Sequence, residues 1–248
     1  MKNTLWSFGD SFSEEVINLP EHNERLRYVR EYLNGIPYKT WPGIVADKLN
    51  YNYRNHAATG GKKFKYLGQG NSNDSTFFNV TEYSSEFKRG DIIVVGFTNV
   101  GRYQIGTSSG DVWTILPNQY FDINTDRYLQ HYMDRIDNDY YLHEMLQKFK
   151  ILETLSKVVG FTIYYWNWTG DFHISETDMV KDNWIVNQIF GKDVGFNYIL
   201  HENDSKLQSI REETNGDCND GHWGKHVNDI LGNVFYDHIK NKITKNDE

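Results

Sequence analysis

A serine and a histidine near opposite ends of the chain have the side chains that acyl transfer requires. Ser11 lies in the segment FGDSF, directly after a short run typical of a strand, and His222 precedes a stretch with periodic apolar residues. A serine hydroxyl becomes an effective nucleophile when an adjacent base takes its proton. We therefore expect Ser11 to act as a nucleophile and His222 as its base, provided that the fold brings them together.

Acyl transfer also requires donors aimed at the oxyanion that forms on the attacked carbonyl. Gly60 lies in the segment NHAATGG, where a glycine can bring its backbone N–H close to a substrate oxygen. Asn99 ends the segment GFTN and offers a side-chain amide as a second donor. Asp220, two residues before His222, offers a carboxylate that could orient the imidazole.

Strand-like runs alternate with helical stretches, a rhythm that predicts a parallel sheet with helices on both faces. The expected strands are residues 4–8, 51–56, 91–97 and 161–166. The third run is continuously apolar and rich in β-branched residues, so we expect it to be central and buried on both faces.

Three helices position these strands. Residues 40–50 carry a proline just inside the start, as helix N-termini favour. Apolar side chains recur every three or four residues within residues 139–159, as in an amphipathic helix, and Gly160 follows as a stop signal. A last helix is expected over residues 224–243, with one apolar face.

The length fits a single α/β domain over residues 1–248, with polar insertions that interrupt the regular pattern. Because loops at the carboxyl ends of parallel strands build the site in such folds, we expect the insertions to set substrate choice. They span residues 13–39, 101–138 and 168–214.

Composition excludes several classes of function. The formal net charge of -8 argues against nucleic-acid binding, which needs clustered Lys and Arg. A single cysteine, Cys218, allows neither an intramolecular disulfide framework nor a thiolate zinc cluster. No apolar run reaches the length of a membrane span, and no signal peptide is recognised at the start. We expect a protein of the cytoplasm as synthesised, or of a virion if a phage encodes it.

The ordered segments around Ser11, Gly60, Asn99 and His222 resemble the blocks of the SGNH (GDSL-like) esterase superfamily. The resemblance extends from residue 4 to about residue 240, although only the blocks and the strand-helix rhythm around them match. The segment WPGIVA that leads to Asn55 and Gly60 is similar to the helix, strand and Asn-x-x-x-x-Gly block that follow the serine in this family. The resemblance implies a three-layer α/β/α sandwich with a mostly parallel five-stranded sheet.

The family resemblance also implies a mechanism. Ser11 would attack an ester carbonyl, His222 would take its proton, and water would hydrolyse the acyl-enzyme. The backbone N–H groups of Ser11 and Gly60 and the amide of Asn99 would form the oxyanion hole. Neither a cofactor nor a metal is implied.

The chain departs from the family pattern in its third and last blocks. Asn99 comes one residue late, and Thr98 occupies the expected place, so either side chain could serve the oxyanion hole. A divergent branch of phage and bacterial relatives has Thr or Ser there, followed by an arginine, which would make Arg102 a contact for a polar or anionic substrate group. In the last block Asp220, Asp217 or no acid could orient His222.

The expected substrate is a small-molecule or glycan ester, because polar, aromatic-rich insertions favour an acetylated sugar over a long-chain lipid. The aromatic content of 15% could supply stacking surfaces for sugars or simply core packing. Two other functions stay open on the same scaffold: a non-catalytic carbohydrate-binding or virion structural module, and an acyltransferase. A metal pair of His222 with His226 would conflict with the Ser-His arrangement and lacks a clear third ligand beyond Asp220. The sequence predicts no oligomeric state.

Overall fold

The structure is a computed structural model of the chain. It describes residues 2–9, 13–19, 21, 23–57, 72–97, 103–106, 112–115, 138–167, 185, 189 and 223–246.

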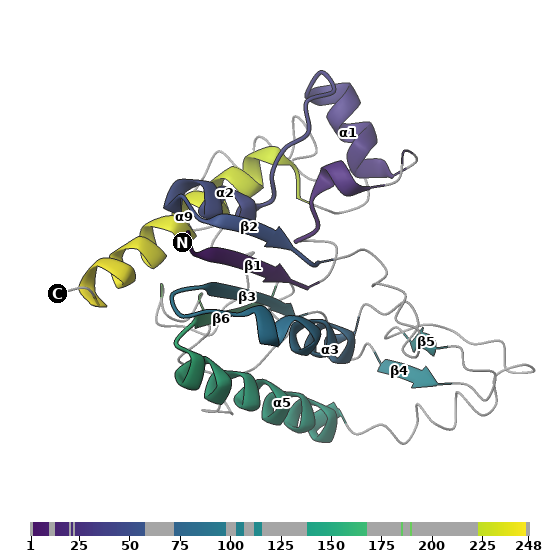
Figure 1. The fold of residues 1–248 in the computed structure, drawn as a ribbon. Helices are drawn as coiled ribbons and strands as arrows, with labels where there is room; N and C mark the ends of the chain where they lie inside the picture. The colour runs from purple at the N-terminus through teal and green to yellow at the C-terminus, as the bar shows by residue number, and fades with distance from the viewer. Residues whose placement is uncertain are drawn as a thin grey trace, which may run out of the picture.

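A parallel sheet forms the centre of the described structure (Figure 1). Its strands are β1 (Thr4–Phe8), β2 (Asn52–Asn55), β3 (Ile92–Phe97) and β6 (Thr162–Asn167), in the order β2-β1-β3-β6. These four strands confirm the four runs predicted from the sequence. Among the described residues this sheet has four strands rather than the expected five. The sequence contains four strand-like runs, and the fifth strand was expected from the family resemblance.

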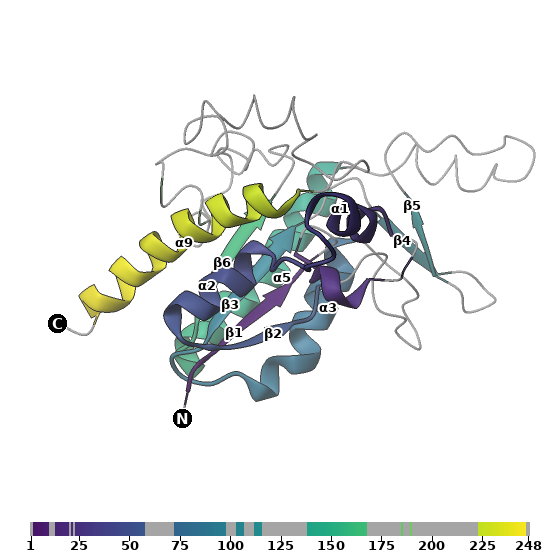
Figure 2. The same ribbon diagram turned by 90° about the horizontal axis from the view of Figure 1, so that it is seen from above.

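Side chains alternate between the two faces of the sheet, and each face packs against its own pair of helices. Figures 1 and 2 show α2 (Trp41–Leu49) and α9 (Lys225–Asn246) on one face, and α3 (Asn73–Tyr83) and α5 (Asn138–Val159) on the other. One core includes Leu5, Val45, Ile92, Val94, Leu231 and Phe235. The opposite core includes Trp6, Phe8, Val80, Ile93, Val95 and Phe149. This is an α/β fold, and its layers fit a three-layer sandwich.

The three predicted helices are confirmed, with small shifts at their ends. Thr40 is the N-cap residue of α2, and a proline occupies its first turn. Helix α5 ends before Gly160, whose φ of +91° suits a residue without a side chain. Helix α9 begins one residue later than expected and extends three residues further, to Asn246.

Helix α3 was not predicted, because the side chains that it buries are largely polar. Asn73, Ser75, Thr76 and Asn79 are buried together with Val80, so an apolar periodicity is weak. Its N-terminus does carry a recognisable signal, since the Ser72 side chain accepts a hydrogen bond from the backbone N–H of Ser75. The short η2 (Ser84–Glu86) follows directly.

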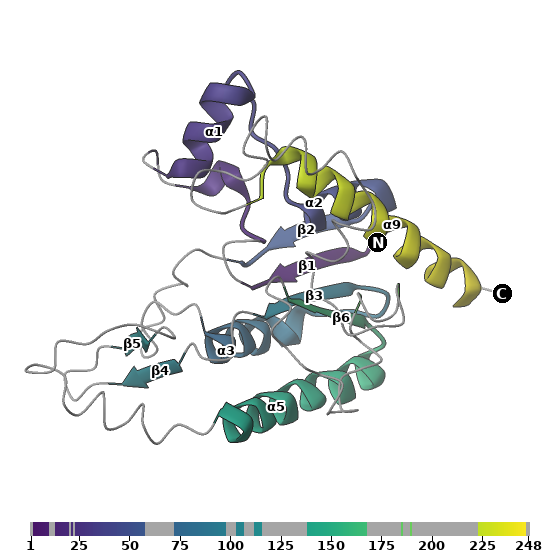
Figure 3. The ribbon, with the colours of Figure 1, turned by 180° about the vertical axis from the view of Figure 1, so that it is seen from behind.

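Two of the expected insertions contain regular structure beyond the carboxyl ends of the strands (Figures 1 and 3). The first holds η1 (Val16–Asn18) and α1 (Glu24–Tyr32). The second holds an antiparallel pair, β4 (Tyr103–Gly106) and β5 (Val112–Ile115). In the third, the described residues Ile185 and Ile189 pack against the α2–α9 side of the core.

Asp91 fastens the amino-terminal edge of the sheet. Its carboxylate accepts hydrogen bonds from the backbone N–H of Thr4 at 2.8 Å, the indole of Trp6 at 3.1 Å and the backbone N–H of Lys88 at 3.1 Å. The residue is only 3% exposed. These bonds tie β1 to the start of β3, so this carboxylate is a structural element of the fold.

We predict that Asp91→Ala lowers the free energy of unfolding by about 3 kcal/mol, because buried donors lose their acceptor. Urea denaturation of the two proteins measures the difference. Asp47→Ala is the matched control, since Asp47 is an exposed carboxylate paired with Lys39 and should cost less than about 1 kcal/mol. Equal losses in the two variants would show that the Asp91 contacts contribute no special stability.

Candidate active site

The residues predicted to carry the chemistry lie outside the described residues. This holds for the nucleophile, the base, the oxyanion donors, the arginine and both candidate acids: Ser11, His222, Gly60, Asn99, Thr98, Arg102, Asp220 and Asp217. Their roles stay predictions. The described structure instead places the residues that precede or follow them.

Three of these neighbours lie at one edge of the sheet. Gly9 follows β1, Ala57 follows β2, and Phe97 ends β3. Because the three strands are parallel and adjacent, their carboxyl ends meet at the same edge. The segments that contain Ser11 and Gly60, and the Thr98 and Asn99 pair, therefore all leave the sheet from this edge.

Glycines at this edge allow a close approach of the backbones. A Cβ atom on Gly9 would lie 3.2 Å from the Cα and the carbonyl oxygen of Gly96, and Gly9 has a φ of +146°. A Cβ atom on Gly96 would lie 2.8 Å from the Trp166 ring. Side chains at either position would push β1, β3 and β6 apart where the candidate site begins.

The segment before α9 reaches the same edge through Trp223, the residue after His222. The indole of Trp223 is 5% exposed and lies 6.1 Å from the ring of Trp166, measured between ring centroids. Trp166 is next to the last residue of β6 and packs against Gly96. Described residues next to four of the predicted functional segments thus gather at the carboxyl edge of the sheet.

Asn55 links the segment after β1 to the segment after β2. Its side-chain Nδ2 donates to the backbone carbonyl of Ser13 at 2.6 Å and to the hydroxyl of Tyr53 at 2.8 Å. Its Oδ1 accepts a hydrogen bond from the backbone N–H of Ala57 at 2.8 Å. One amide therefore fixes the backbone two residues after Ser11 and three residues before Gly60.

Glu15 completes a buried polar network around Asn55. Thr40 Oγ1 lies 2.8 Å from Glu15 Oε1 and 3.2 Å from the carbonyl oxygen of Ser13, and the Tyr53 hydroxyl also bonds to Glu15. Burial raises the pKa of Glu15 above its ordinary value of 4.5, although the bonds from Thr40 and Tyr53 oppose the rise. Burial also raises the pKa of Tyr53 well above 10.0, and the charge of Glu15 adds to this effect.

The segment after Ser13 is held by a buried arginine. Arg25, which is 2% exposed, places Nη2 at 3.1 Å from Glu14 Oε2 and donates from Nη1 to the Glu14 carbonyl at 3.2 Å. A buried arginine is stable only when it is paired and hydrogen-bonded. Its bonds therefore require a particular position of the Glu14 backbone.

The N-terminus of α9 is fixed in a comparable way. The Tyr38 hydroxyl donates to the Trp223 carbonyl at 2.8 Å, a buried bond between residues 185 positions apart. The side chain of Asn228 donates to the carbonyls of Trp223 and Gly224 at 3.3 and 3.0 Å, and accepts from the backbone N–H of Trp41 at 2.9 Å. The residue after His222 is therefore attached to α2 and to the segment that precedes α2.

The sequence reasoning missed the positions that hold these segments. Glu15, Arg25, Tyr38, Thr40 and Asn228 carry no motif, and most of their partners are distant in the sequence. The sequence marks Asn55 only as the start of the Asn-x-x-x-x-Gly pattern. A stacking role for aromatic residues is one expectation from the composition, but the side chains of Trp6, Trp41, Trp166 and Trp223 are all buried in the core.

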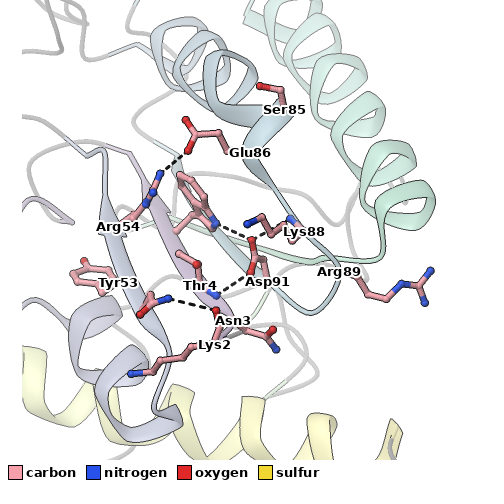
Figure 4. A pocket seen from close by; sticks show the side chains of 12 residues that line it. Lys2, Asn3, Thr4, Tyr53, Arg54, Ser85, Glu86, Lys88, Arg89 and Asp91 are labelled. Atoms are coloured by element: carbon pink, nitrogen blue, oxygen red, sulfur yellow. Dashed lines mark hydrogen bonds and ion pairs between the residues drawn. The ribbon is translucent and has the colours of Figure 1, made fainter.

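The described structure also contains a hollow of about 770 Å³ at the opposite, amino-terminal edge of the sheet (Figure 4). Three of its charged side chains, those of Arg54, Glu86 and Asp91, are engaged in contacts within the fold. Arg54 pairs with Glu86 at 2.6 Å and lies over the ring of Trp6, and Asp91 accepts the three bonds described above. This hollow is separated from the candidate site by the length of the strands.

Neither a metal site nor a membrane span is found in the part of the chain that the structure describes. No group of three or more potential metal ligands gathers among those residues, which include His226 but not His222. Among the described helices, none combines the length and the apolarity that crossing a membrane requires.

Comparisons with known proteins assign no function. No protein-family model matches the sequence, and no curated protein matches it. Among solved structures, the crystal structure of protein YxiM from Bacillus subtilis is similar at 15% identity with a TM-score of 0.44. The similarity covers 98% of this chain and 57% of YxiM, so the chain spans little more than half the length of that protein.

We predict that Glu15→Gln changes the pH dependence of stability. Because the pKa of Glu15 is raised in the folded protein, that state binds a proton more tightly than the unfolded chain does. The free energy of unfolding contributed by this group therefore falls as pH rises from below 4.5 through the raised pKa. The variant lacks this fall, so its stability relative to the parent rises across that window.

Urea denaturation over a pH series that starts below 4.5 measures this relative stability. Glu31→Gln is the matched control, because it removes the same charge from an exposed position on α1 that pairs with Arg27. The control should show no such trend. A stability difference between Glu15→Gln and the parent that is flat with pH would contradict the prediction.

Proposed function

We propose that this chain is a serine hydrolase that cleaves a carboxylic ester through an acyl-enzyme, on an SGNH-like, flavodoxin-like scaffold. The observation that carries the proposal is the convergence of Gly9, Ala57, Phe97 and Trp223 at the carboxyl edge of the sheet. Each of them borders a segment with one of the residue types that acyl transfer needs. The network around Asn55, which bridges two of these segments, supports the same reading.

In the proposed mechanism the Ser11 hydroxyl attacks the ester carbonyl while His222 takes its proton. Donors from the Ser11 and Gly60 backbone, with Asn99 or Thr98, stabilise the oxyanion. The ester C–O bond breaks, and the imidazolium returns its proton to the departing alcohol. Water then hydrolyses the acyl-enzyme with His222 as base, which releases the acid and restores the serine.

Two further residues have supporting roles in this proposal. Asp220 holds the imidazole of His222 in the productive tautomer, with Asp217 as the alternative acid. Arg102 contacts a polar or anionic group of the substrate. Both assignments follow from the family resemblance.

A fluorophosphonate probe, followed by peptide mass spectrometry, tests the nucleophile. We expect labelling of Ser11 that is lost in Ser11→Ala, and a fall in kcat/KM of at least ~10³-fold in Ser11→Ala and in His222→Ala. Ser85→Ala and His143→Ala are the matched controls, because both side chains are exposed. Ser85 lies in η2 at the amino-terminal edge of the sheet, and His143 lies in α5. They should retain labelling and turnover.

A parent protein that does not react, or labelling that persists in Ser11→Ala, would overturn the esterase proposal. A parent protein that is inert to the probe but binds carbohydrate would favour a non-catalytic module instead. Product analysis with added alcohols separates hydrolysis from acyl transfer, because only transfer yields a new ester.

For the substrate we propose an acetylated carbohydrate, on the grounds of the polar insertions over residues 13–39, 101–138 and 168–214. We predict acetate release from acetylated glycans, and a kcat/KM for p-nitrophenyl acetate about tenfold or more above that for a long-chain p-nitrophenyl ester. Chromatographic detection of acetate and a spectrophotometric assay measure the two quantities. Turnover of long-chain esters without acetate release from glycans would contradict this substrate class.

A further inference from the structure

The segment from Ser13 to Trp41 touches both candidate catalytic regions, and we call it the brace. It contains η1 and α1 and has a small core of its own. Its position beyond the carboxyl ends of the strands is visible in Figures 1 and 2. The members of this core are Val16, Leu19, Val29 and Tyr38, with Leu26, Tyr28 and Leu33 packed against them.

The first end of the brace is fixed at two consecutive carbonyls. Ser13 accepts from Asn55 at 2.6 Å and lies 3.2 Å from the hydroxyl of Thr40. Glu14 accepts from the guanidinium of Arg25 at 3.2 Å. The carbonyls of two successive residues, the first of them two positions after the predicted nucleophile, are thereby held by three side chains.

The second end of the brace is fixed to the start of α9. Tyr38 donates to the Trp223 carbonyl, and the backbone N–H of Trp41 donates to the side chain of Asn228. Asn228 in turn donates to the Gly224 carbonyl at 3.0 Å. All of these bonds are buried, so water does not readily replace them when they are lost.

The two ends are connected through packed side chains of the brace itself. Tyr38 contributes its ring to the small core, where it meets the ring of Tyr28 edge-on at 6.0 Å, and contributes its hydroxyl to the Trp223 bond. Arg25 extends from α1 to the Glu14 carbonyl. Because these side chains are closely packed, a displacement of the backbone at one end of the brace is expected to displace the other end.

We propose that the brace sets the distance between the two candidate catalytic segments, with Asn55, Arg25 and Tyr38 as positioning residues. This inference rests on the proposed esterase function for its kinetic consequence. Residues 13–39 of the brace were expected from the sequence to be an insertion that sets substrate choice, and the contacts suggest a second role in positioning. None of the three positioning residues takes part in the reaction, since each acts through a backbone carbonyl.

Tyr38→Phe removes one hydroxyl and keeps the ring, so it isolates the bond to Trp223. We expect kcat for a short p-nitrophenyl ester to fall roughly tenfold to hundredfold, because small displacements of catalytic groups are costly. KM should change less than twofold, since the side chain is buried and lies away from solvent. Tyr32→Phe is the matched control, because Tyr32 belongs to α1 and is 52% exposed, and it should leave both constants unchanged.

A double variant tests whether both ends act on a single geometry. At the first end, Asn55→Ala removes the donor to the Ser13 carbonyl. Thr40→Val replaces it if Asn55→Ala folds poorly, because it removes the hydroxyl near Ser13 and keeps the side-chain volume. We expect Tyr38→Phe combined with Thr40→Val to reduce kcat by less than the product of the two single effects. Independent, multiplicative effects, or an equal rise in KM, would overturn the inference.

Hydrogen exchange separates failure of this inference from failure of the esterase proposal. Tyr38→Phe should speed amide exchange in peptides that cover residues 13–19 as well as those that cover residues 223–228, while Tyr32→Phe should not. A parent protein that is inert to fluorophosphonate removes the esterase proposal and leaves this exchange result as the test of coupling. Faster exchange confined to residues 223–228 would show that the brace does not couple the two ends.

Discussion

Parallel hydrogen bonding of β1 to β2 on one side and to β3 on the other determines where every other feature lies. Because β1 aligns Leu5 with Tyr53 and also with Ile92, the three strands run in one direction and end at the same edge. Parallel strands need long connections, and those connections supply the helices that cover both faces. The segments that follow these three strands therefore all leave the sheet at one edge.

The two edges of this sheet use buried polar side chains for different ends. At the amino-terminal edge, Asp91 accepts from donors on β1 and on the approach to β3, which closes the sheet. At the carboxyl edge, Asn55 donates to the Ser13 carbonyl of a connecting segment, and the Thr40 hydroxyl lies between that carbonyl and Glu15. These bonds go to Ser13, which belongs to no strand, so the second set of buried polar groups is not part of strand pairing. Positioning of the connecting segment accounts for it.

Sequence patterns predicted the regular framework well, because its signals are local. The apolar run before Phe97, the spacing within residues 139–159 and the glycine at 160 each specify an element within a few residues. Helix α3 escaped prediction because it buries Asn73 and Asn79, whose polarity hides the face that packs. A polar helix face can be exposed or buried, and the sequence alone does not distinguish the two. The residues that pack against α3 show that this face is buried.

The residues of the candidate site stay predictions from the sequence, and the residues that hold their neighbours in place could not be predicted from it. Ser11 and His222 were identified from residue types and order along the chain. Tyr38 and Trp223 are 185 positions apart, and nothing near either residue indicates that they meet. For the number of strands, the prediction erred by excess rather than by omission. The sequence contains four strand-like runs, and the fifth strand was taken from the family pattern. Local patterns therefore outperformed the resemblance for the framework, whereas contacts across the sequence required the structure.

The protons of the carboxyl-edge network are all accounted for when Glu15 is ionised. Asn55 has two amide protons, one for the Ser13 carbonyl and one for Tyr53, and the hydroxyls of Tyr53 and Thr40 both point to Glu15. A proton on Glu15 converts this carboxylate from an acceptor into a donor, which frees the single proton of Thr40 for the Ser13 carbonyl at 3.2 Å. The Ser13 carbonyl therefore keeps at least one donor in either protonation state. The buried charge adjusts stability with pH, while the orientation of the backbone after Ser11 depends on Asn55, whose amide does not titrate.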